Sequence, residues 1–267
     1  MIDETLVCTN LPFENKSRKV RVYVPAHEEG ETFPVIYMTD GQNLFDEESS
    51  SFGCWYTREA VRDERENSGH AAIIVGVHND GEMMERTNEL TPASIGKIVY
   101  TGDIPKEAVK LFKPQGETFD NFIINTVMPA IEARFPVEKG RNATAFCGSS
   151  SGGLQSFFTA MSHPDGFCAA GVFSPAFLFY APEDIQSWIN GRLQADMPYL
   201  YFYCGCGDPL EEILCRYTER VYDMLTECYD PEKLNEVILA DQRHNESAWA
   251  MMFKDFLHTF LTRREDF

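Results

Sequence analysis

The chain has 267 residues, of which 43% are hydrophobic and 13% are aromatic. A chain of this length and composition can bury a large core, which excludes an intrinsically disordered protein. The 42 acidic residues outnumber the 23 basic residues and give a net charge of −19. Such an anionic surface repels phosphate backbones and acidic lipid headgroups, so we expect neither a nucleic-acid partner nor a membrane partner.

The amino-terminal sequence and the cysteines bear on the cellular compartment of the protein. Residues 1–10, MIDETLVCTN, lack the basic and apolar regions of a secretory signal, so we expect a cytoplasmic protein. Eight cysteines in a chain of this length do not indicate a disulfide framework. Cys204 and Cys206 form a C-x-C pair, but no second Cys or His pair at zinc spacing accompanies it. We therefore expect buried thiols, no metal and no cofactor.

Short apolar runs alternate with longer helical patterns along the chain. The first two runs, residues 5–11 and 19–25, predict an antiparallel hairpin of half-exposed strands. Continuous apolar runs typical of strands buried in a parallel sheet follow at 33–40, 71–78, 143–148, 169–174, 198–204 and 235–240. Helical patterns lie between them at about 55–65, 118–134, 152–162, 183–193, 210–228 and 246–262. This order predicts one α/β domain over residues 1–267, with a mostly parallel sheet and helices on both faces.

Residues 79–117 do not fit this alternation, because glycines and prolines interrupt them throughout. Excursions of this length in a compact domain are often binding loops or lids. Apolar side chains that could line a pocket there are Met83, Met84, Tyr100 and Phe112. We expect this long loop to help form a substrate site.

The stretch CGSSSGGLQ, residues 147–155, contains three consecutive serines between glycines. Only Ser150 has glycine both two residues before it, at Gly148, and two residues after it, at Gly152. This G-x-S-x-G spacing is typical of a nucleophilic serine on a tight turn between a strand and a helix. An apolar run precedes the motif and a helical pattern follows it, which favours a nucleophile over an ordinary Gly/Ser loop.

A serine nucleophile needs a histidine base, and His244 is the best-placed candidate. It lies between the last predicted strand and the last predicted helix, where catalytic loops of open α/β sheets are found. His163 and His258 fall within or at the end of predicted helices instead.

Asp208 is the leading candidate for the acid that orients the histidine, because it follows the strand at 198–204. The same stretch also fits a structural role, since Asp208, Pro209 and Glu211 match an N-cap, a proline at the first helical position and a capping-box acid. Asp241 and Glu211 are the alternative acids.

In this order Ser150, Asp208 and His244 resemble the triad of the α/β-hydrolase fold. More narrowly, the chain resembles the esterase family that includes esterase D and the feruloyl, acetylxylan and enterochelin-type esterases. The segments that carry this resemblance are VIYMTDGQNLFD (35–46), NDGEMMERTNELTP (79–92), CGSSSGGLQSFF (147–158), GVFSPAF (171–177), CGCGDPLEE (204–212) and HNESAW (244–249).

The resemblance implies a serine esterase that forms an acyl-enzyme on a small-molecule, carbohydrate or siderophore ester. It implies an oxyanion hole formed by the backbone N–H groups of Ser151 and Gln42, although many relatives carry methionine at the position of Ser151. Candidate substrate-contacting residues are Asp40, Arg86, Glu89, Phe177 and Trp249. Phe177 fits a core role equally well, and Trp249 also fits packing of the last predicted helix. Two alternative functions stay open: acyl transfer to an alcohol and a non-catalytic binding role. A homo-oligomer also stays open.

Overall fold

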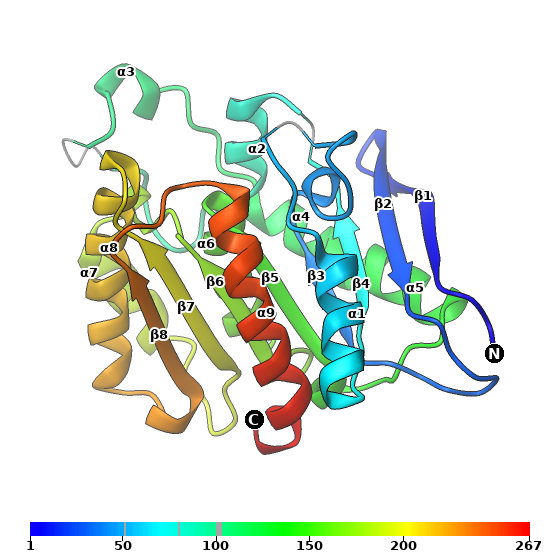
Figure 1. Cartoon of the computed structure of the whole chain (residues 1–267). Coiled ribbons are helices and arrows are strands. Elements are labelled where there is room, and N and C mark those ends of the chain that lie inside the picture. The colour runs from blue at the N-terminus through cyan, green and yellow to red at the C-terminus, as the bar shows by residue number, and fades with distance from the viewer. Residues whose placement is uncertain (51, 80, 100–102) are drawn as a thin grey trace.

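The computed structural model describes residues 1–50, 52–79, 81–99 and 103–267. Within these residues, eight strands form one sheet in the order β1-β2-β4-β3-β5-β6-β7-β8 (Figure 1). The strands are β1 (Thr5–Phe13), β2 (Lys16–Val24), β3 (Val35–Met38), β4 (Ile73–Val77), β5 (Thr144–Ser149), β6 (Ala169–Phe173), β7 (Tyr199–Gly205) and β8 (Leu234–Leu239). β1 pairs with β2, and β2 with β4, in antiparallel fashion, whereas every pair from β4 to β8 is parallel. The predicted hairpin and mostly parallel sheet are confirmed.

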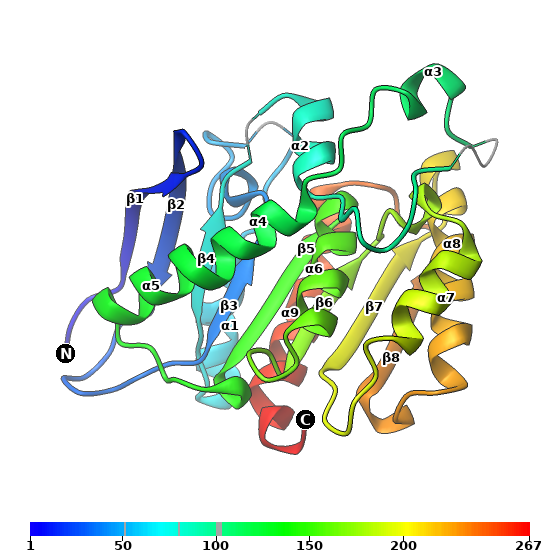
Figure 2. The ribbon, with the colours of Figure 1, turned by 180° about the vertical axis from the view of Figure 1, so that it is seen from behind.

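Helices cover both faces of the sheet, as the alternating pattern predicts. Two helices, α1 (Thr57–Ser68) and α9 (Glu246–Arg263), pack together on the face seen in Figure 1. The opposite face, seen in Figure 2, carries α4 (Gly116–Phe122), η2 (Ile123–Val127), α5 (Met128–Arg134), α6 (Ser151–Ser162), α7 (Pro182–Asn190) and α8 (Pro209–Thr226). The predicted helix at 118–134 corresponds to α4, η2 and α5, which follow one another without a break.

The central strands are buried along their whole length because helices cover both of their faces. Every residue of β5, β6 and β7 is buried, which explains why their sequences are continuously apolar and do not alternate. Trp55 stacks on Phe173 at the end of β6, with ring centroids 5.6 Å apart, and also contacts Trp249 of α9. This aromatic packing ties the carboxyl end of the sheet to α9.

The segment at 79–117 is partly helical and not a continuous loop. It contains α2 (Met83–Glu89) and α3 (Lys106–Val109), which lie beyond the carboxyl ends of the strands at the top of Figure 1. Met83 and Met84 are exposed there, and Phe112 packs against Phe179 with ring centroids 4.8 Å apart. Tyr100, a predicted pocket residue, lies outside the described residues.

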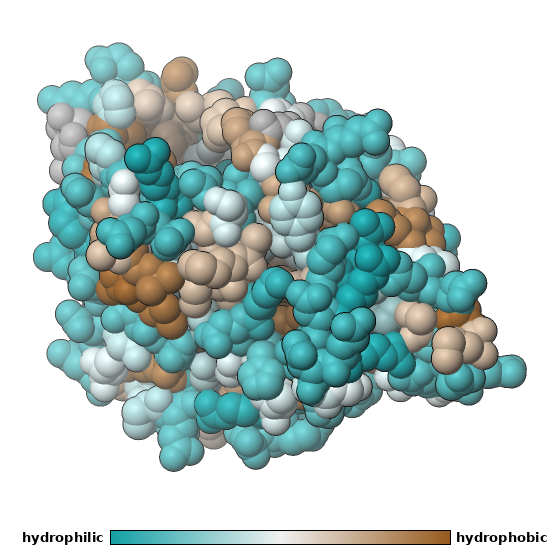
Figure 3. Space-filling model, in the orientation of Figure 1, coloured by the Kyte–Doolittle hydropathy of each residue, from teal (hydrophilic) through white to brown (hydrophobic). Residues whose placement is uncertain are grey.

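Hydrophilic residues predominate on the face shown in Figure 3, as expected from the acidic composition. An apolar patch on this face lies over the edge strand β8, where Val237, Ile238 and Leu239 are partly exposed. In the described part of the chain, no helix has the length and apolar character that crossing a bilayer requires.

Candidate active site

Ser150 stands on the turn between β5 and α6, where the sequence predicts a nucleophile. Its backbone has φ 60° and ψ −123°, a left-handed conformation that is strained for a serine. The N–H of Ser150 donates to the carbonyl of Phe173 over 2.9 Å, and its own carbonyl accepts from the N–H of Ala176 over 3.1 Å. These two bonds hold the turn against the end of β6. The predicted strand-to-helix position of the motif is confirmed.

The two glycines of the motif are needed because the turn is packed tightly against β3. A Cβ atom on Gly148 would lie 2.5 Å from Oγ1 of Thr39 and 2.6 Å from the carbonyl oxygen of Gly152. A Cβ atom on Gly152 would also overlap Oγ1 of Thr39. No side chain fits at either position, so the spacing of the glycines follows from steric contact.

The two predicted oxyanion donors lie on segments that follow neighbouring strands. Ser151 is the first residue of α6, and no carbonyl of the same helix accepts its N–H. Gln42 belongs to the short turn η1 (Gly41–Asn43), which follows β3 and begins after Asp40 in a left-handed conformation. Because β3 and β5 are paired in parallel, both segments begin at the same edge of the sheet.

His244 lies in the loop from β8 to α9, which passes over the carboxyl ends of the strands in Figure 1. Its ring Nδ1 is 3.1 Å from Oε1 of Glu211, a geometry in which Nδ1–H donates to the carboxylate. Its backbone N–H donates to Oδ2 of Asp208 over 2.8 Å. The ring also packs edge-to-face with Trp249, with centroids 4.8 Å apart. The imidazole is therefore fixed by a carboxylate, an indole and its own backbone.

Asp208 does not contact the imidazole ring, which corrects the sequence-based expectation that it orients His244 through the ring. Its Oδ1 caps α8 by accepting from the N–H groups of Leu210 and Glu211, over 2.9 and 3.0 Å. Its Oδ2 accepts the backbone N–H of His244. Burial raises the pKa of Asp208, but these N–H donors together hold it below its usual range. Both oxygens of Asp208 are thus used to hold the loops together.

Glu211, an alternative acid in the sequence analysis, occupies the position beside the ring. It is fully buried, and its Oε1 accepts a hydrogen bond from Oγ of Ser174 over 2.7 Å. Ser174 in turn accepts from Nε1–H of Trp249 over 3.0 Å and has a positive φ of 41°. Cys204 Sγ lies 3.3 Å from the second oxygen, Oε2. A buried carboxylate needs such donors, because an ion left unpaired inside a protein is costly.

The sequence does not indicate that Ser174 takes part in the site, because a lone serine at the end of a strand suggests only a turn. Its role depends on a contact with Glu211, 37 residues further along the chain.

Asp40 and Arg86 pair with each other beneath the turn that holds Gln42. Arg86 Nε is 2.5 Å from Oδ1 of Asp40 and Nη2 is 2.7 Å from Oδ2, while Asn79 donates to the same carboxylate. Nη2 also donates to the carbonyl of Ser149 over 3.3 Å. Burial raises the pKa of Asp40, but the charge and hydrogen bonds of Arg86 hold it below its usual range. This pair connects the η1 turn to the nucleophile turn.

The other predicted substrate-contacting residues also have partners inside the protein. Glu89 forms a buried ion pair with Arg18, with both N–O distances 2.6 Å. Phe177 has no exposed surface, so it fills the core role that the sequence left open. Trp249 is 5% exposed and contacts His244 and Ser174. All three side chains are buried, and Trp249 is the one that contacts the histidine.

Replacing Arg86 with methionine should lower the free energy of unfolding by about 3–5 kcal/mol, because the buried Asp40 carboxylate would lose its cation. The pKa of Asp40 is depressed in the folded state, so the pair stabilises the protein above the unfolded carboxyl pKa of about 3.9. The stability difference between wild type and variant should therefore shrink as the pH falls below about 4.

Urea unfolding at several pH values measures this difference. Arg62→Met is the matched control, because its ion pair with Glu4 is partly exposed and should contribute less than about 1 kcal/mol. An equal loss of stability in both variants would contradict the structural role given to Arg86.

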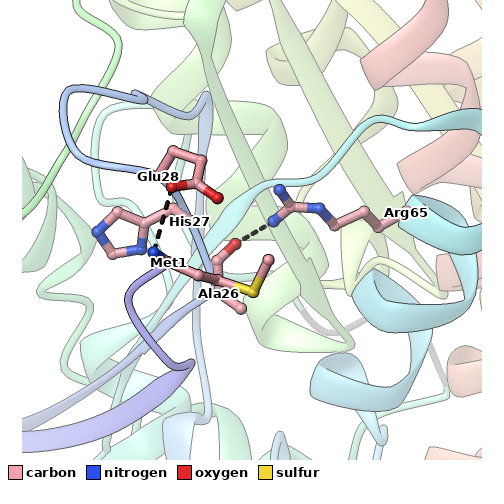
Figure 4. Close-up of a pocket in the computed structure, with 5 residues that line it drawn as sticks. All are labelled: Met1, Ala26, His27, Glu28 and Arg65. Carbon is pink, nitrogen blue, oxygen red and sulfur yellow. Dashed lines mark hydrogen bonds and ion pairs between the residues drawn. The ribbon is translucent and has the colours of Figure 1, made fainter.

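A hollow of about 170 Å³ lies near the amino terminus, away from the carboxyl ends of the strands (Figure 4). In it the terminal ammonium pairs with Glu28 over 3.2 Å, and Arg65 donates to the carbonyl of Ala26. These groups satisfy one another, and none of them belongs to the elements that carry Ser150, Glu211 or His244.

A family model described as "Putative esterase" matches residues 13–200 of the chain. The chain belongs to this esterase family, which confirms the resemblance seen in the sequence. Its enzyme class is that of the carboxylic ester hydrolases.

Solved structures share the α/β-hydrolase-like fold over nearly the whole chain. A ferulic acid esterase has 17% identity and a TM-score of 0.66, with 98% of this chain and 99% of that chain covered. An IroE-like serine hydrolase from Shewanella oneidensis has 18% identity and a TM-score of 0.70, with 95% and 79% covered. The siderophore hydrolase EstA from Aspergillus nidulans has 18% identity and a TM-score of 0.67, with 94% of each chain covered.

Proposed function

We propose that the protein is a serine esterase in which Ser150 is the nucleophile, His244 the general base and Glu211 the acid that orients the base. The observation that carries this proposal is the contact of 3.1 Å between Nδ1 of His244 and the fully buried Glu211. A histidine held in this way presents its other nitrogen, Nε2, as the proton acceptor. The strained turn that exposes Ser150 lies at the same edge of the sheet.

In the proposed reaction, Oγ of Ser150 attacks the ester carbonyl while His244 takes the hydroxyl proton. The N–H groups of Ser151 and Gln42 donate to the oxyanion that forms, and the dipole of α6 favours negative charge there. His244 then protonates the departing alcohol, and an activated water molecule releases the acid from Ser150. Glu211 stabilises the imidazolium form of His244 during both steps.

We propose a small-molecule carboxylic ester as substrate, with carbohydrate and siderophore esters as the first classes to test. The support is the names of similar structures, among them a ferulic acid esterase, a siderophore hydrolase and a ferric enterobactin esterase. A cytoplasmic location is part of the proposal, because all eight cysteines are free thiols, which suits a reducing compartment.

A panel of esters tests the function: short-chain p-nitrophenyl esters, an acetylated sugar, a methyl ferulate and a catecholate trilactone. We expect at least one to be hydrolysed with burst kinetics when deacylation is slow. Product analysis with added alcohols distinguishes hydrolysis from acyl transfer. No turnover and no reaction with a fluorophosphonate would favour a non-catalytic binding protein.

Replacing Ser174 with alanine should lower kcat by about ten- to a hundredfold and leave KM unchanged. The reason is that the buried Glu211 would lose a charge-assisted hydrogen bond, which contributes roughly 1.5–3 kcal/mol. Trp249→Phe is the companion variant: it removes the indole N–H that donates to Ser174 and part of the ring that packs on His244, but it leaves the bond between Ser174 and Glu211 in place and should have a smaller effect. A Ser174→Ala enzyme with normal kcat and a lowered melting temperature would show that Ser174 acts only on stability.

A further inference from the structure

Three cysteine sulfurs gather directly behind Glu211, and the proposed mechanism uses none of them. Sγ of Cys206, in the loop from β7 to α8, lies 3.2 Å from Sγ of Cys215 on α8. Cys204, at the end of β7, contacts Oε2 of Glu211 over 3.3 Å. Cys206 is partly exposed, whereas Cys204 and Cys215 are buried. One sulfur of this group is therefore reachable from solvent and touches a second that is not.

The pair spans the part of the chain that holds the histidine. Cys206 and Cys215 flank Asp208 and Glu211 in sequence, and these two carboxylates fix the backbone and the ring of His244. The loop of Cys206 is also bonded to the segment that leads to His244. The N–H of Cys206 donates to the carbonyl of Leu239 over 3.1 Å, and that of Gly207 donates to Gln242 over 2.7 Å. A shift of Cys206 relative to Cys215 would be transmitted to both sides of the site.

The thiols differ in how easily they ionise. The hydrogen bond from Cys204 lowers the pKa of Cys215, and the thiol of Cys206 lowers it further, against the effect of burial. Burial and the bond that it donates raise the pKa of Cys206 to about 12. A peroxide arrives from solvent, so Cys206 is the sulfur that it meets first. Cys215, whose reactive thiolate form is favoured, lies beside Cys206 and is placed to react with it once it is oxidised.

We propose that Cys206 and Cys215 are a redox-active pair, which a peroxide converts into an intramolecular disulfide, and that this oxidation slows ester hydrolysis at the adjoining site. The first part concerns the thiols alone. The second part rests on the proposed function.

The reaction balances with one peroxide molecule. The sulfur of Cys206 attacks a peroxide oxygen, so that an S–O bond forms, the O–O bond breaks and the hydroxide leaves with the thiol proton of Cys206 as water. The thiolate of Cys215 then attacks the sulfenic acid on Cys206. An S–S bond forms, the S–O bond breaks, and the hydroxide leaves with the proton that Cys215 gave up as a second water. Two thiols are oxidised by two electrons, and the peroxide is reduced.

The disulfide would move the groups that hold the histidine. The two sulfurs, now 3.2 Å apart, must approach by about 1 Å to reach a disulfide bond length of about 2.0 Å. We expect this approach to draw the loop of Asp208 and the helix of Glu211 toward each other. Because a displacement of about 1 Å in an active site can cost about a hundredfold in rate, we expect oxidation to lower kcat by about ten- to a hundredfold.

Mass spectrometry tests the first part without any assay of activity. The protein is treated with hydrogen peroxide, its remaining thiols are alkylated, and the tryptic peptide 193–216, which contains all three cysteines, is fragmented. We expect three alkyl groups on this peptide before oxidation. After oxidation we expect one, on Cys204, with Cys206 joined to Cys215. If all three stay alkylated while the exposed Cys8 and Cys228 are oxidised, or if Cys204 is the partner of Cys215, the proposed pair is wrong.

Ester hydrolysis before and after peroxide tests the second part. The wild type should lose activity and regain it with dithiothreitol, and Cys206→Ser should keep its activity throughout. Cys228→Ser is the matched control and should behave like the wild type, since Cys228 is exposed and lies elsewhere on the surface. A disulfide at 206–215 that leaves kcat unchanged would overturn the regulatory part. If no ester is hydrolysed at all, the proposed function fails, and the mass result still decides the thiol pair.

Discussion

Replacing Glu211 with glutamine should lower kcat for ester hydrolysis by about 10⁴-fold while KM and the fold are preserved. A neutral amide cannot stabilise an imidazolium on His244. Ser174 and Nδ1 of His244 both contact the same oxygen, Oε1 of Glu211. An NH₂ group in its place would donate to Nδ1, which would place the ring proton on Nε2 and leave the base unable to accept the proton of Ser150. Steady-state kinetics with circular dichroism as a fold check measure this effect.

Asp208→Asn is the matched control for Glu211→Gln, because the two carboxylates lie three residues apart and both contact His244. An asparagine caps a helix as well as an aspartate does, and its carbonyl oxygen can accept the bonds that Oδ1 accepts now. We therefore expect only a modest fall in kcat and a small loss of stability. If Asp208→Asn instead loses several orders of magnitude in kcat while Glu211→Gln stays active, the acid has been assigned to the wrong residue.

Replacing Ser150 with alanine should lower kcat by about 10⁶-fold, since the acyl-enzyme can then no longer form. Substrate binding should be retained, because the backbone N–H groups of the turn are unchanged. Kinetics with the best ester of the panel measure this loss.

The neighbouring serines provide the controls for Ser150→Ala. Ser149 and Ser151 are 4% and 3% exposed, so neither hydroxyl faces a bound ester. Alanine at either position should keep most of the activity, since the N–H of Ser151 comes from the backbone. A Ser150→Ala enzyme that keeps substantial turnover would exclude an acyl-enzyme on this residue.

The fold could be predicted because each apolar run is long enough to indicate a strand, although β8, at the edge of the sheet, is only partly buried. Continuous apolar runs predict the strands from β3 to β8, and an alternating pattern predicts the hairpin of β1 and β2. The turn at Ser150 could be predicted because its strain requires glycines at fixed spacing, and that spacing is visible in the sequence.

The acid could not be decided from the sequence, because Asp208 and Glu211 each fit both a capping role and a catalytic role. Side-chain direction decides between them: Asp208 turns back onto its own helix, whereas Glu211 points inward to the ring of His244. Two partners of Glu211, Ser174 and His244, lie 37 and 33 residues away in sequence. Contacts between distant segments of this kind leave no local pattern.

The partners of Asp40 and Arg86 were equally hidden. A charged residue on a segment near the site suggests a substrate contact, yet these two residues neutralise each other below the η1 turn. Their pairing depends on how α2 folds back over the end of β3, which the composition of residues 79–117 does not reveal.

We propose that Ser150 alone is the nucleophile and that His244 and Glu211 activate it. Labelling with a fluorophosphonate, followed by peptide mapping, distinguishes Ser150 from every other serine of the chain. We expect one phosphonyl group per chain, bound to Ser150. Labelling should be much slower in Glu211→Gln and absent in Ser150→Ala. A label on Ser149, on Ser151 or on any serine outside this turn would contradict this proposal, as would labelling of Ser150 at the wild-type rate in Glu211→Gln.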